Sequence, residues 1–169
     1  MSISVCLASY NGELFIEKQI SSILKELSSA DEIIIVDDCS NDNTIKKINS
    51  FDDPRIKLYS NEVNSGEVYS FNKAILLSVN QNIFLSDQDD IWIPGRVEMM
   101  LDCLNNPKTL LVSSNFSWIN NDDDPITIFY DGVSSDTSKR YFKNVVDIFI
   151  GKTNYFGCAM AFKKDLVPI

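Results

Sequence analysis

Short apolar segments alternate with amphipathic helical patterns over residues 1–107, and this alternation most constrains the fold. Ile3–Ala8 and Glu32–Val36 are short and largely apolar, which is typical of strands buried on both faces of a parallel sheet. Between them, apolar residues recur at helical spacing, at Ile16, Ile20, Ile23, Leu24 and Leu27. Strands that alternate with helices predict an α/β domain with a mainly parallel sheet flanked by helices.

Further elements continue this pattern. Two more strands are expected, at Arg55–Tyr59 and Asn82–Leu85. Three more helices are expected with the following buried residues: Ile45, Ile48 and Phe51 after Thr44; Val68, Phe71, Ile75 and Val79 within 67–79; and Val97, Met100, Leu101 and Leu104 after Pro94. With 169 residues and no linker or repeat, we predict one domain over residues 1–169.

The second half of the chain is less regular. Its pattern first predicts a hairpin, with a long strand at Thr109–Trp118, a turn at Asn120–Pro125 and a returning strand at Ile126–Tyr130. A polar loop at Asp131–Ser138 and a helix marked by Tyr141, Val145, Ile148 and Phe149 are expected next. The pattern ends with a strand at Gly157–Phe162 and the first turn of another helix at Lys163–Leu166. We expect the acidic run Asp122–Asp124 to be a solvated hairpin tip.

Carboxylates follow two of the predicted strands. Asp87, Asp89 and Asp90 come directly after Asn82–Leu85, and stacked like charges oppose each other's ionisation unless a cation lies among them. In extended chain Asp87 and Asp89 point to the same side and can share one hard cation. The alternative is a solvated turn, but the apolar residues on both sides favour partial burial. We therefore predict a divalent metal that carries a diphosphate, at the sheet edge where such folds bind ligands.

Asp37 and Asp38 follow the second strand and have two open interpretations. They either accept hydrogen bonds from a nucleotide base or ribose, or cap the helix after Thr44, where Asp42 or Asn41 would serve equally well. Three weaker candidates also have a packing or loop alternative: Tyr10 as a ring stacked on a base, Asn64–Gly66 as backbone donors, and Trp92 as the wall of a sugar cleft.

Charge and cysteine usage narrow the class of partner. A net charge of −9 without a basic cluster argues against nucleic acid, and an anionic substrate would need a metal to neutralise it. Without histidine or a CxxC pair, a zinc site of cysteines and histidines is excluded, and we expect Cys6 and Cys158 to be small core residues. No signal peptide or membrane span is apparent, so the expected location is a reduced cytoplasm.

Four motifs together resemble the family 2 inverting glycosyltransferases of the GT-A fold. They are Ala8–Gly12, the stretch EIIIVDDCSNDNT at Glu32–Thr44, Asn61–Gly66, and SDQDDIW at Ser86–Trp92. The last motif with Pro94, and GCAMAF at Gly157–Phe162, look like the bacterial rhamnosyltransferase-type branch. The resemblance implies sugar transfer with inversion from a dTDP- or UDP-linked donor, with rhamnose suggested by the branch, to a saccharide or lipid-linked saccharide in surface polysaccharide synthesis. It also implies a protein that associates peripherally with the inner face of the membrane.

The resemblance also implies roles for individual residues. The nucleotide would contact Ala8, Tyr10, Asp37, Asp38, Asn64, Gly66 and Asp87, with Asp38 on the base. Mg²⁺ or Mn²⁺ on the diphosphate would be held by Asp87, Asp89 and Asp90, and would stabilise the leaving nucleoside diphosphate. Trp92 and Gly157 would lie on the acceptor side. The nucleotide-sugar-binding half would span about 1–107 and the start of the acceptor half 108–169.

One departure from the family concerns the catalytic base. An inverting transfer needs a carboxylate to deprotonate the acceptor hydroxyl. In this branch it belongs to a His-Asp-type motif beyond the GCAMAF-like strand, and this chain has no histidine. We expect a C-terminally truncated chain whose base lies beyond Ile169.

Two rival functions follow. One is a non-catalytic nucleotide-sugar-binding module that never had a base. The other is a phosphoacceptor receiver domain, which is disfavoured by the spacing of its acidic pair from Lys163.

Overall fold

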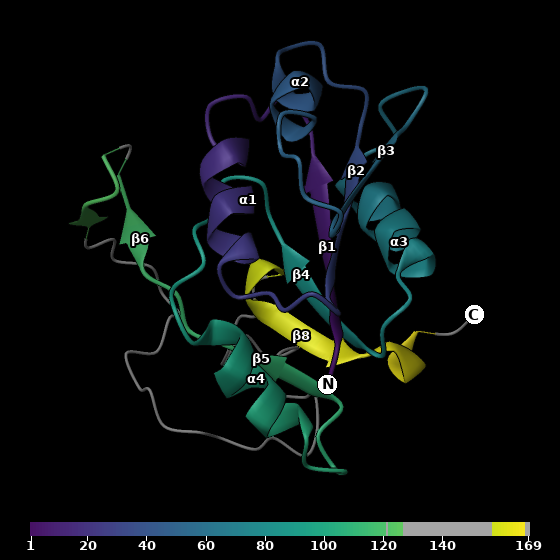
Figure 1. Ribbon diagram of the computed structural model, residues 1–169, viewed down its shortest axis with the longest axis vertical. Helices are drawn as coiled ribbons and strands as arrows, with labels where there is room; N and C mark the ends of the chain where they lie inside the picture. The colour runs from purple at the N-terminus through teal and green to yellow at the C-terminus, as the bar shows by residue number, and fades with distance from the viewer. Residues whose placement is uncertain (121, 127–156, 168–169) are drawn as a thin grey trace, which may run out of the picture.

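The computed structural model describes residues 1–120, 122–126 and 157–167, and it forms an α/β sheet domain (Figure 1). The elements in chain order are β1 (Ile3–Ser9), α1 (Ile16–Leu24), β2 (Glu32–Asp37), α2 (Thr44–Ile48), β3 (Ile56–Ser60), α3 (Glu67–Leu77), β4 (Asn82–Ser86), α4 (Arg96–Leu104), β5 (Leu111–Ser113), β6 (Trp118–Ile119), β7 (Pro125–Ile126), the 3₁₀ turn η1 (Gly157–Ala159), β8 (Met160–Lys163) and the 3₁₀ turn η2 (Lys164–Leu166). Within the described ranges, no helix has the length and apolar character needed to cross a bilayer.

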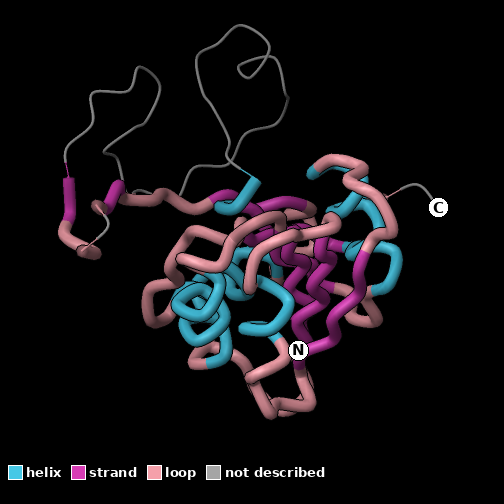
Figure 2. The backbone as a smooth tube through the Cα atoms, turned by 90° about the horizontal axis from the view of Figure 1, so that it is seen from above, coloured by secondary structure: helices cyan, strands magenta, loops and turns pink. Residues whose placement is uncertain are grey.

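The six-stranded sheet has the order β3-β2-β1-β4-β8-β5. Figure 2 shows the strands in magenta and the helices in cyan, seen from above. The first four strands are parallel, as predicted, whereas β8 runs antiparallel to β4 and β5. The parallel register pairs Ser9 with Asp37 and Leu7 with Ser86, so β1, β2 and β4 end at the same edge. Every residue of β2 is buried, in agreement with its apolar sequence.

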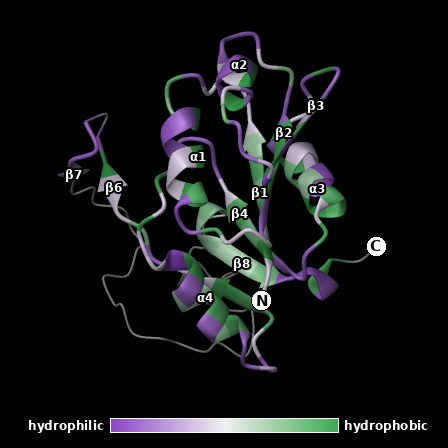
Figure 3. Ribbon diagram, in the orientation of Figure 1, coloured by the Kyte–Doolittle hydropathy of each residue, from purple (hydrophilic) through white to green (hydrophobic). Residues whose placement is uncertain are grey.

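Helices cover both faces of this sheet. One core cluster joins β1 and β2 side chains to the apolar faces of α1, α2 and α4. A second joins Cys6, Ile34 and Val36 to Ala74 and Ile75 of α3 on the opposite face. Figure 3 shows apolar colour concentrated on the strands between these layers. The predicted inward face of α4 is confirmed, because Val97, Met100 and Leu104 are buried.

The predicted buried face of α3 is wrong in part. Val68 and Val79 are 75% and 70% exposed, whereas Ser70 and Ala74 are fully buried and Ile75 is buried. Small side chains let the helix backbone lie close to the sheet. The helix also ends before Val79, because Ser78 adopts an extended conformation after Leu77. Apolar spacing alone did not reveal either constraint.

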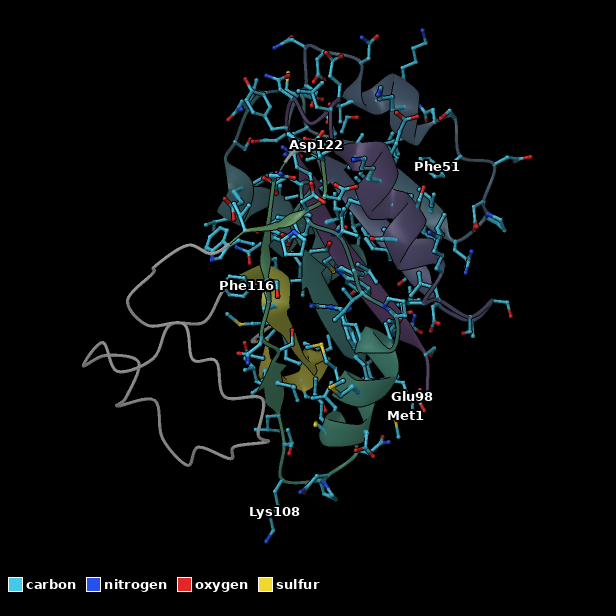
Figure 4. The ribbon with its side chains drawn as sticks, turned by 90° about the vertical axis from the view of Figure 1, so that its left-hand side faces the viewer. Met1, Phe51, Glu98, Lys108, Phe116 and Asp122 are labelled. Atoms are coloured by element: carbon cyan, nitrogen blue, oxygen red, sulfur yellow. The ribbon has the colours of Figure 1, made fainter. Side chains whose placement is uncertain are left out.

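The predicted strand Thr109–Trp118 is divided into β5 and β6. After β5, the N–H of Ser114 donates to the carbonyl of Ala159 (2.9 Å), and the chain then leaves the sheet. β6 pairs with β7 in the predicted hairpin, whose acidic tip is exposed, with Asp123 bound to Lys18 of α1 at 3.0 Å. Figure 4 shows Lys108 and Asp122 far apart along the molecule's long axis. The predicted loop at 131–138 and the helix around Tyr141 lie outside the described residues, as does the returning strand beyond Ile126.

The end of the described chain differs from prediction in detail. The expected strand at Gly157–Phe162 begins instead with η1, and β8 follows from Met160. The expected helical turn after Lys163 is the 3₁₀ turn η2.

Candidate metal and nucleotide site

The acidic loop after β4 brings two carboxylates and a thiol together. One carboxylate oxygen each of Asp87 and Asp90 and the Sγ of Cys158 lie within 4.8 Å of one another, and all three residues are partly buried. Asp89 is exposed and lies outside this group. The strand ends at Ser86 and residues 88–89 form a turn, so the alternation of an extended chain does not apply here. Asp87 therefore faces Asp90 across the turn.

Burial and mutual repulsion disfavour the charged forms of this cluster. Burial raises the pKa of Asp87 to about 6, and the negative charges of Asp90, Glu67 and Asp89 add to this effect. Burial likewise raises the pKa of Asp90, although its hydrogen bond with the Cys158 thiol acts in the opposite direction. None of the ion pairs among the described residues includes Asp87, Asp89 or Asp90. A bound divalent cation would relieve this repulsion, and carboxylate oxygens suit Mg²⁺ or Mn²⁺.

The expectation that Cys158 is a core residue is wrong, whereas Cys6 is fully buried as predicted. Sheet register explains the position of Cys158. The antiparallel ladder pairs Phe84 of β4 with Ala161 of β8, and continuing that register brings Cys158 opposite Asp87. Burial, followed by the charge of Asp90, raises the pKa of the Cys158 thiol, so the thiol remains protonated and hydrogen-bonds with Asp90. The sequence carried no signal for this contact, because it depends on strand pairing.

Arg96, at the start of α4, fixes the backbone beside this cluster. Its Nη2 donates to the carbonyl of Cys158 (2.6 Å), and its Nη1 donates to the Oγ of Ser114 (3.1 Å). The guanidinium carbon lies 4.8 Å above the centre of the Trp92 ring, which also packs against Phe84 with 5.9 Å between centroids. Trp92 is only 5% exposed, so the packing alternative describes this ring and a sugar-stacking wall does not.

A pocket of about 460 Å³ lies beside the acidic loop and contains most of the predicted nucleotide residues. Its lining is Ala8, Ser9, Tyr10, Asp38, Asn64, Gly66, Glu67, Ser70, Phe71, Asp87, Gln88 and Asp89. The ends of β1, β2 and β4 therefore converge here, as the parallel sheet predicts. Another hollow, of about 510 Å³, lies where the strands begin, lined by residues that include Met1, Asn80 and Lys163, and it contains none of these candidates.

Asp38 organises one wall of this pocket. Its Oδ1 accepts hydrogen bonds from Asn61 Nδ2 and the N–H of Ser65, both at 2.8 Å, and its Oδ2 accepts from the N–H of Gly66 at 2.7 Å. Burial would raise the pKa of Asp38, but these hydrogen bonds outweigh burial and hold the pKa below its usual value. The carboxylate therefore stays charged, and it holds Gly66 in a left-handed conformation (φ 90°) at the start of α3.

The neighbouring Asp37 does not line the pocket. It is fully buried, and its carboxylate accepts from the hydroxyls of Ser9 (3.0 Å) and Ser40 (2.6 Å). The capping alternative does not describe Asp37 either, since Asp42 accepts the N–H of Thr44 at 2.9 Å. Gly157 is exposed in η1, next to Cys158.

Gln88 is a pocket residue that the sequence reasoning missed. Its Oε1 accepts from the N–H of Tyr10 (2.9 Å) and its Nε2 donates to the Tyr10 carbonyl (3.0 Å), so one amide holds the β1 loop to the β4 loop. Gly12 permits this approach, because an ideal Cβ there would lie 2.6 Å from the Cδ of Gln88. Tyr10 as a whole residue remains 43% exposed beside the pocket. The glycine of the Asn-Gly turn was the available signal for such a close contact.

Comparison with known families identifies the chain. The model of "Glycosyl transferase family 2" matches residues 4–167. The chain belongs to this family. The Escherichia coli protein named UDP-Glc:alpha-D-GlcNAc-diphosphoundecaprenol beta-1,3-glucosyltransferase WfgD is 36% identical over 119 residues, which cover 70% of this chain and 47% of WfgD. The dTDP-rhamnosyl transferase RfbG of Shigella flexneri is 34% identical over 116 residues, covering 64% of this chain and 40% of RfbG. The chain thus spans about half the length of these relatives or less.

Solved structures confirm the GT-A-like fold. TarS of S. aureus in complex with UDP superposes with a TM-score of 0.73 at 20% identity, covering 98% of this chain and 48% of that one. The mannosyltransferase PcManGT of Pyrobaculum calidifontis, in complex with GDP-Man and Mn²⁺, gives a TM-score of 0.69 at 18% identity, covering 97% of this chain and 45% of that one.

Proposed function

We propose that this chain binds the donor of a bacterial glycosyltransferase, a nucleotide-diphosphate sugar, with the nucleotide in the 460 Å³ pocket. The observation that carries the proposal is the convergence of Tyr10, Asp38, Asn64 and Gly66 with the acidic loop in one pocket at the carboxyl ends of the strands. In this assignment residues 1–107 supply the donor side and residues 108–169 begin the acceptor side.

Each pocket wall has a task in this proposal. The exposed Tyr10 ring stacks on the base, and the loop held by Asp38 presents Asn64 and Gly66 to the nucleotide. In this proposal Asp38 accepts an N–H of the base through a lone pair beside the one that the Gly66 N–H occupies. Asp37 supports the pocket without contacting the nucleotide, since the hydrogen bonds that it accepts from Ser9 and Ser40 fix the loop that carries Asp38.

The cation site fits Mg²⁺ or Mn²⁺. Asp87 and Asp90 would hold the ion, with Asp89 at the pocket rim. When bound, the ion neutralises the diphosphate and stabilises the leaving nucleoside diphosphate. The negative charges of Asp87 and Asp90 then offset the positive charge of the ion. Gln88, which lies between these two residues in the sequence, holds the loop to Tyr10 through its side-chain amide. No carboxylate of this loop is assigned as the base of an inverting transfer, because Asp87 and Asp90 serve the ion and Asp89 lies outside their group.

The names of the relatives support a proposal for the acceptor and the donor. WfgD is named for a diphosphoundecaprenol-linked acceptor and UDP-Glc, so we propose a lipid-linked saccharide acceptor in surface polysaccharide synthesis, at the inner face of the membrane. UDP is favoured over dTDP because the TarS complex holds UDP and the WfgD donor is UDP-linked. A dTDP-rhamnose donor, as in the name of RfbG, is the second candidate.

Calorimetric titration of the 169-residue chain with UDP and with dTDP, each with and without Mn²⁺, tests the proposal. We expect UDP binding to require Mn²⁺ and to weaken at least about tenfold in Asp87→Ala and Asp90→Ala. Asp124→Ala, at the exposed hairpin tip, is the matched control and should bind like the unaltered chain. UDP binding that is independent of Mn²⁺ and unchanged in Asp87→Ala would overturn the site assignment. Donor binding without transfer in a chain extended to the relatives' length would support the non-catalytic module instead.

A further inference from the structure

Cys158 gives the acidic loop a soft donor that the proposed Mg²⁺ or Mn²⁺ chemistry does not use. Its Sγ and the carboxylate oxygens of Asp87 and Asp90 lie within 4.8 Å of one another, close enough for one ion to contact all three after small side-chain rotations. The three residues come from two distant chain segments, which meet because β8 pairs with β4. All three are partly buried and remain open on the solvent side.

The backbone that carries the thiol is fixed in place. The Cys158 carbonyl accepts from Arg96 Nη2 at 2.6 Å, and the next carbonyl, of Ala159, accepts from the N–H of Ser114 at 2.9 Å. Arg96 in turn is held by its contact with the Trp92 ring. The position of the thiol is thus set by groups outside the cluster, which is the kind of support that orients ligands in protein metal sites.

The donor set favours a different class of cation from that of an all-oxygen loop. Mg²⁺ takes oxygen ligands almost exclusively, whereas thiolates select softer ions such as Zn²⁺ and Co²⁺. Three protein ligands with one open position are also the usual arrangement of catalytic zinc sites.

We propose that Cys158 is a third protein ligand at the cation site of Asp87 and Asp90, and that this site binds thiophilic divalent cations of the Zn²⁺ and Co²⁺ class in competition with Mn²⁺. The inference rests on the proposed function only in placing a cation between the two carboxylates. On binding, the S–H bond breaks, a sulfur–metal bond forms and the proton leaves to solvent, so no oxidant or reductant is needed. The alternative to metal ligation is a Cys158 thiol that only donates a hydrogen bond to Asp90.

Titration of the unaltered chain with Co²⁺ tests this proposal, because a cobalt–thiolate bond gives near-ultraviolet charge-transfer absorption that oxygen ligands do not. We expect this band in the unaltered chain, its loss in Cys158→Ser, and a Co²⁺ affinity in that variant that is at least about tenfold weaker. Cys103→Ser is the matched control, because Cys103 is another partly exposed cysteine and lies on α4 outside the cluster; its band should be unchanged.

The same preparations separate this proposal from the proposed function. Mn²⁺-dependent UDP binding is measured beside the Co²⁺ titration. If Cys158→Ser binds UDP with Mn²⁺ normally but loses the cobalt band, both proposals stand. If Co²⁺ binds without the band, or the band persists in Cys158→Ser, the thiol is not a ligand, whatever UDP does. If UDP binding does not depend on Mn²⁺ although the cobalt band is present, the metal site is supported and its proposed role in donor binding is refuted.

Discussion

Replacing Asp87 with asparagine should stabilise the metal-free domain at neutral pH. Burial and the charges of Asp90, Glu67 and Asp89 raise the pKa of Asp87 to about 6 in the folded chain, from an ordinary value of 3.8. At pH 7 the folded state therefore holds a charge that the unfolded chain accommodates more easily. Asparagine keeps the size of the side chain and its acceptor oxygen, and removes that charge.

The size of the effect follows from the pKa values. A rise from 3.8 to about 6 corresponds to about 3 kcal/mol if the group were fully buried, at about 1.4 kcal/mol per pH unit. Asp87 is partly exposed, and solvent screening reduces this figure, so we expect about 1 kcal/mol. For a chain of this size, about 1 kcal/mol raises the Tm by about 2–4 °C.

The sign of the pH dependence is fixed by the raised pKa. Below the unfolded-state value both states of the chain carry a neutral Asp87, and the substitution changes little. The penalty of the charged form grows between the unfolded-state value of 3.8 and the folded-state value of about 6, and it is complete above the latter. The gain from Asp87→Asn should therefore be small at pH 4 and nearly complete at pH 7.

Thermal unfolding of the unaltered chain and Asp87→Asn at pH 4 and pH 7, without metal, measures this difference. Asp124→Asn at the exposed hairpin tip is the control and should show no such pH-dependent gain. Adding Mn²⁺ with UDP should raise the Tm of the unaltered chain and leave that of the variant unchanged, since only a bound ligand stabilises. Loss of stability in Asp87→Asn at pH 7, or an equal gain at both pH values, would refute the reasoning.

Two further predictions concern the pocket walls. Gly12→Ala should lower the free energy of unfolding in urea by about 1–2 kcal/mol, because the new Cβ displaces the Gln88 amide from its two hydrogen bonds. In a Gln88→Ala background the same substitution should be neutral, and equal losses in both backgrounds would contradict the clash. Asp38→Ala leaves the N–H groups of Ser65 and Gly66 without their acceptor, so it should lower the free energy of unfolding by about 2–4 kcal/mol and abolish UDP binding measured by calorimetry. Because folding lowers the pKa of Asp38, its contribution to stability is lost as the pH falls through the folded-state pKa. A loss of stability in the variant that persists unchanged in acid would contradict this explanation.

The parallel half of the fold could be predicted from the sequence because burial on both faces leaves a direct trace. The strand at Glu32–Val36 has no polar face, and the helix after Pro94 shows a regular apolar stripe. The buried face of α3 could not be predicted in this way. Its inward residues include Ser70, which is polar, and Ala74, which is too small to stand out in an apolar pattern, and the helix ends at the extended Ser78.

The candidate site was predictable wherever it depended on strand ends. Tyr10, Asp38 and Asp87 each follow a parallel strand, and parallel strands end together, so their convergence follows from the topology. The contact of Cys158 was not predictable, because it depends on an antiparallel register. For Gln88 the sequence offered only Gly12 as a signal of close approach, and nothing in it named the side-chain amide that reaches the other loop.

The place of β8 in the sheet has a consequence for synthesis of the chain on the ribosome. β8 is made after β4 and β5, yet it lies between them. Until residues 160–163 emerge, the growing chain has β1 to β4 available to pair, but one edge of β4 stays open, and open edges invite pairing with other chains. The cluster of Asp87, Asp90 and Cys158 cannot assemble before that edge closes. Cation binding should therefore follow the pairing of β8 with β4, and a nascent chain released before β8 would combine an exposed strand edge with an incomplete site.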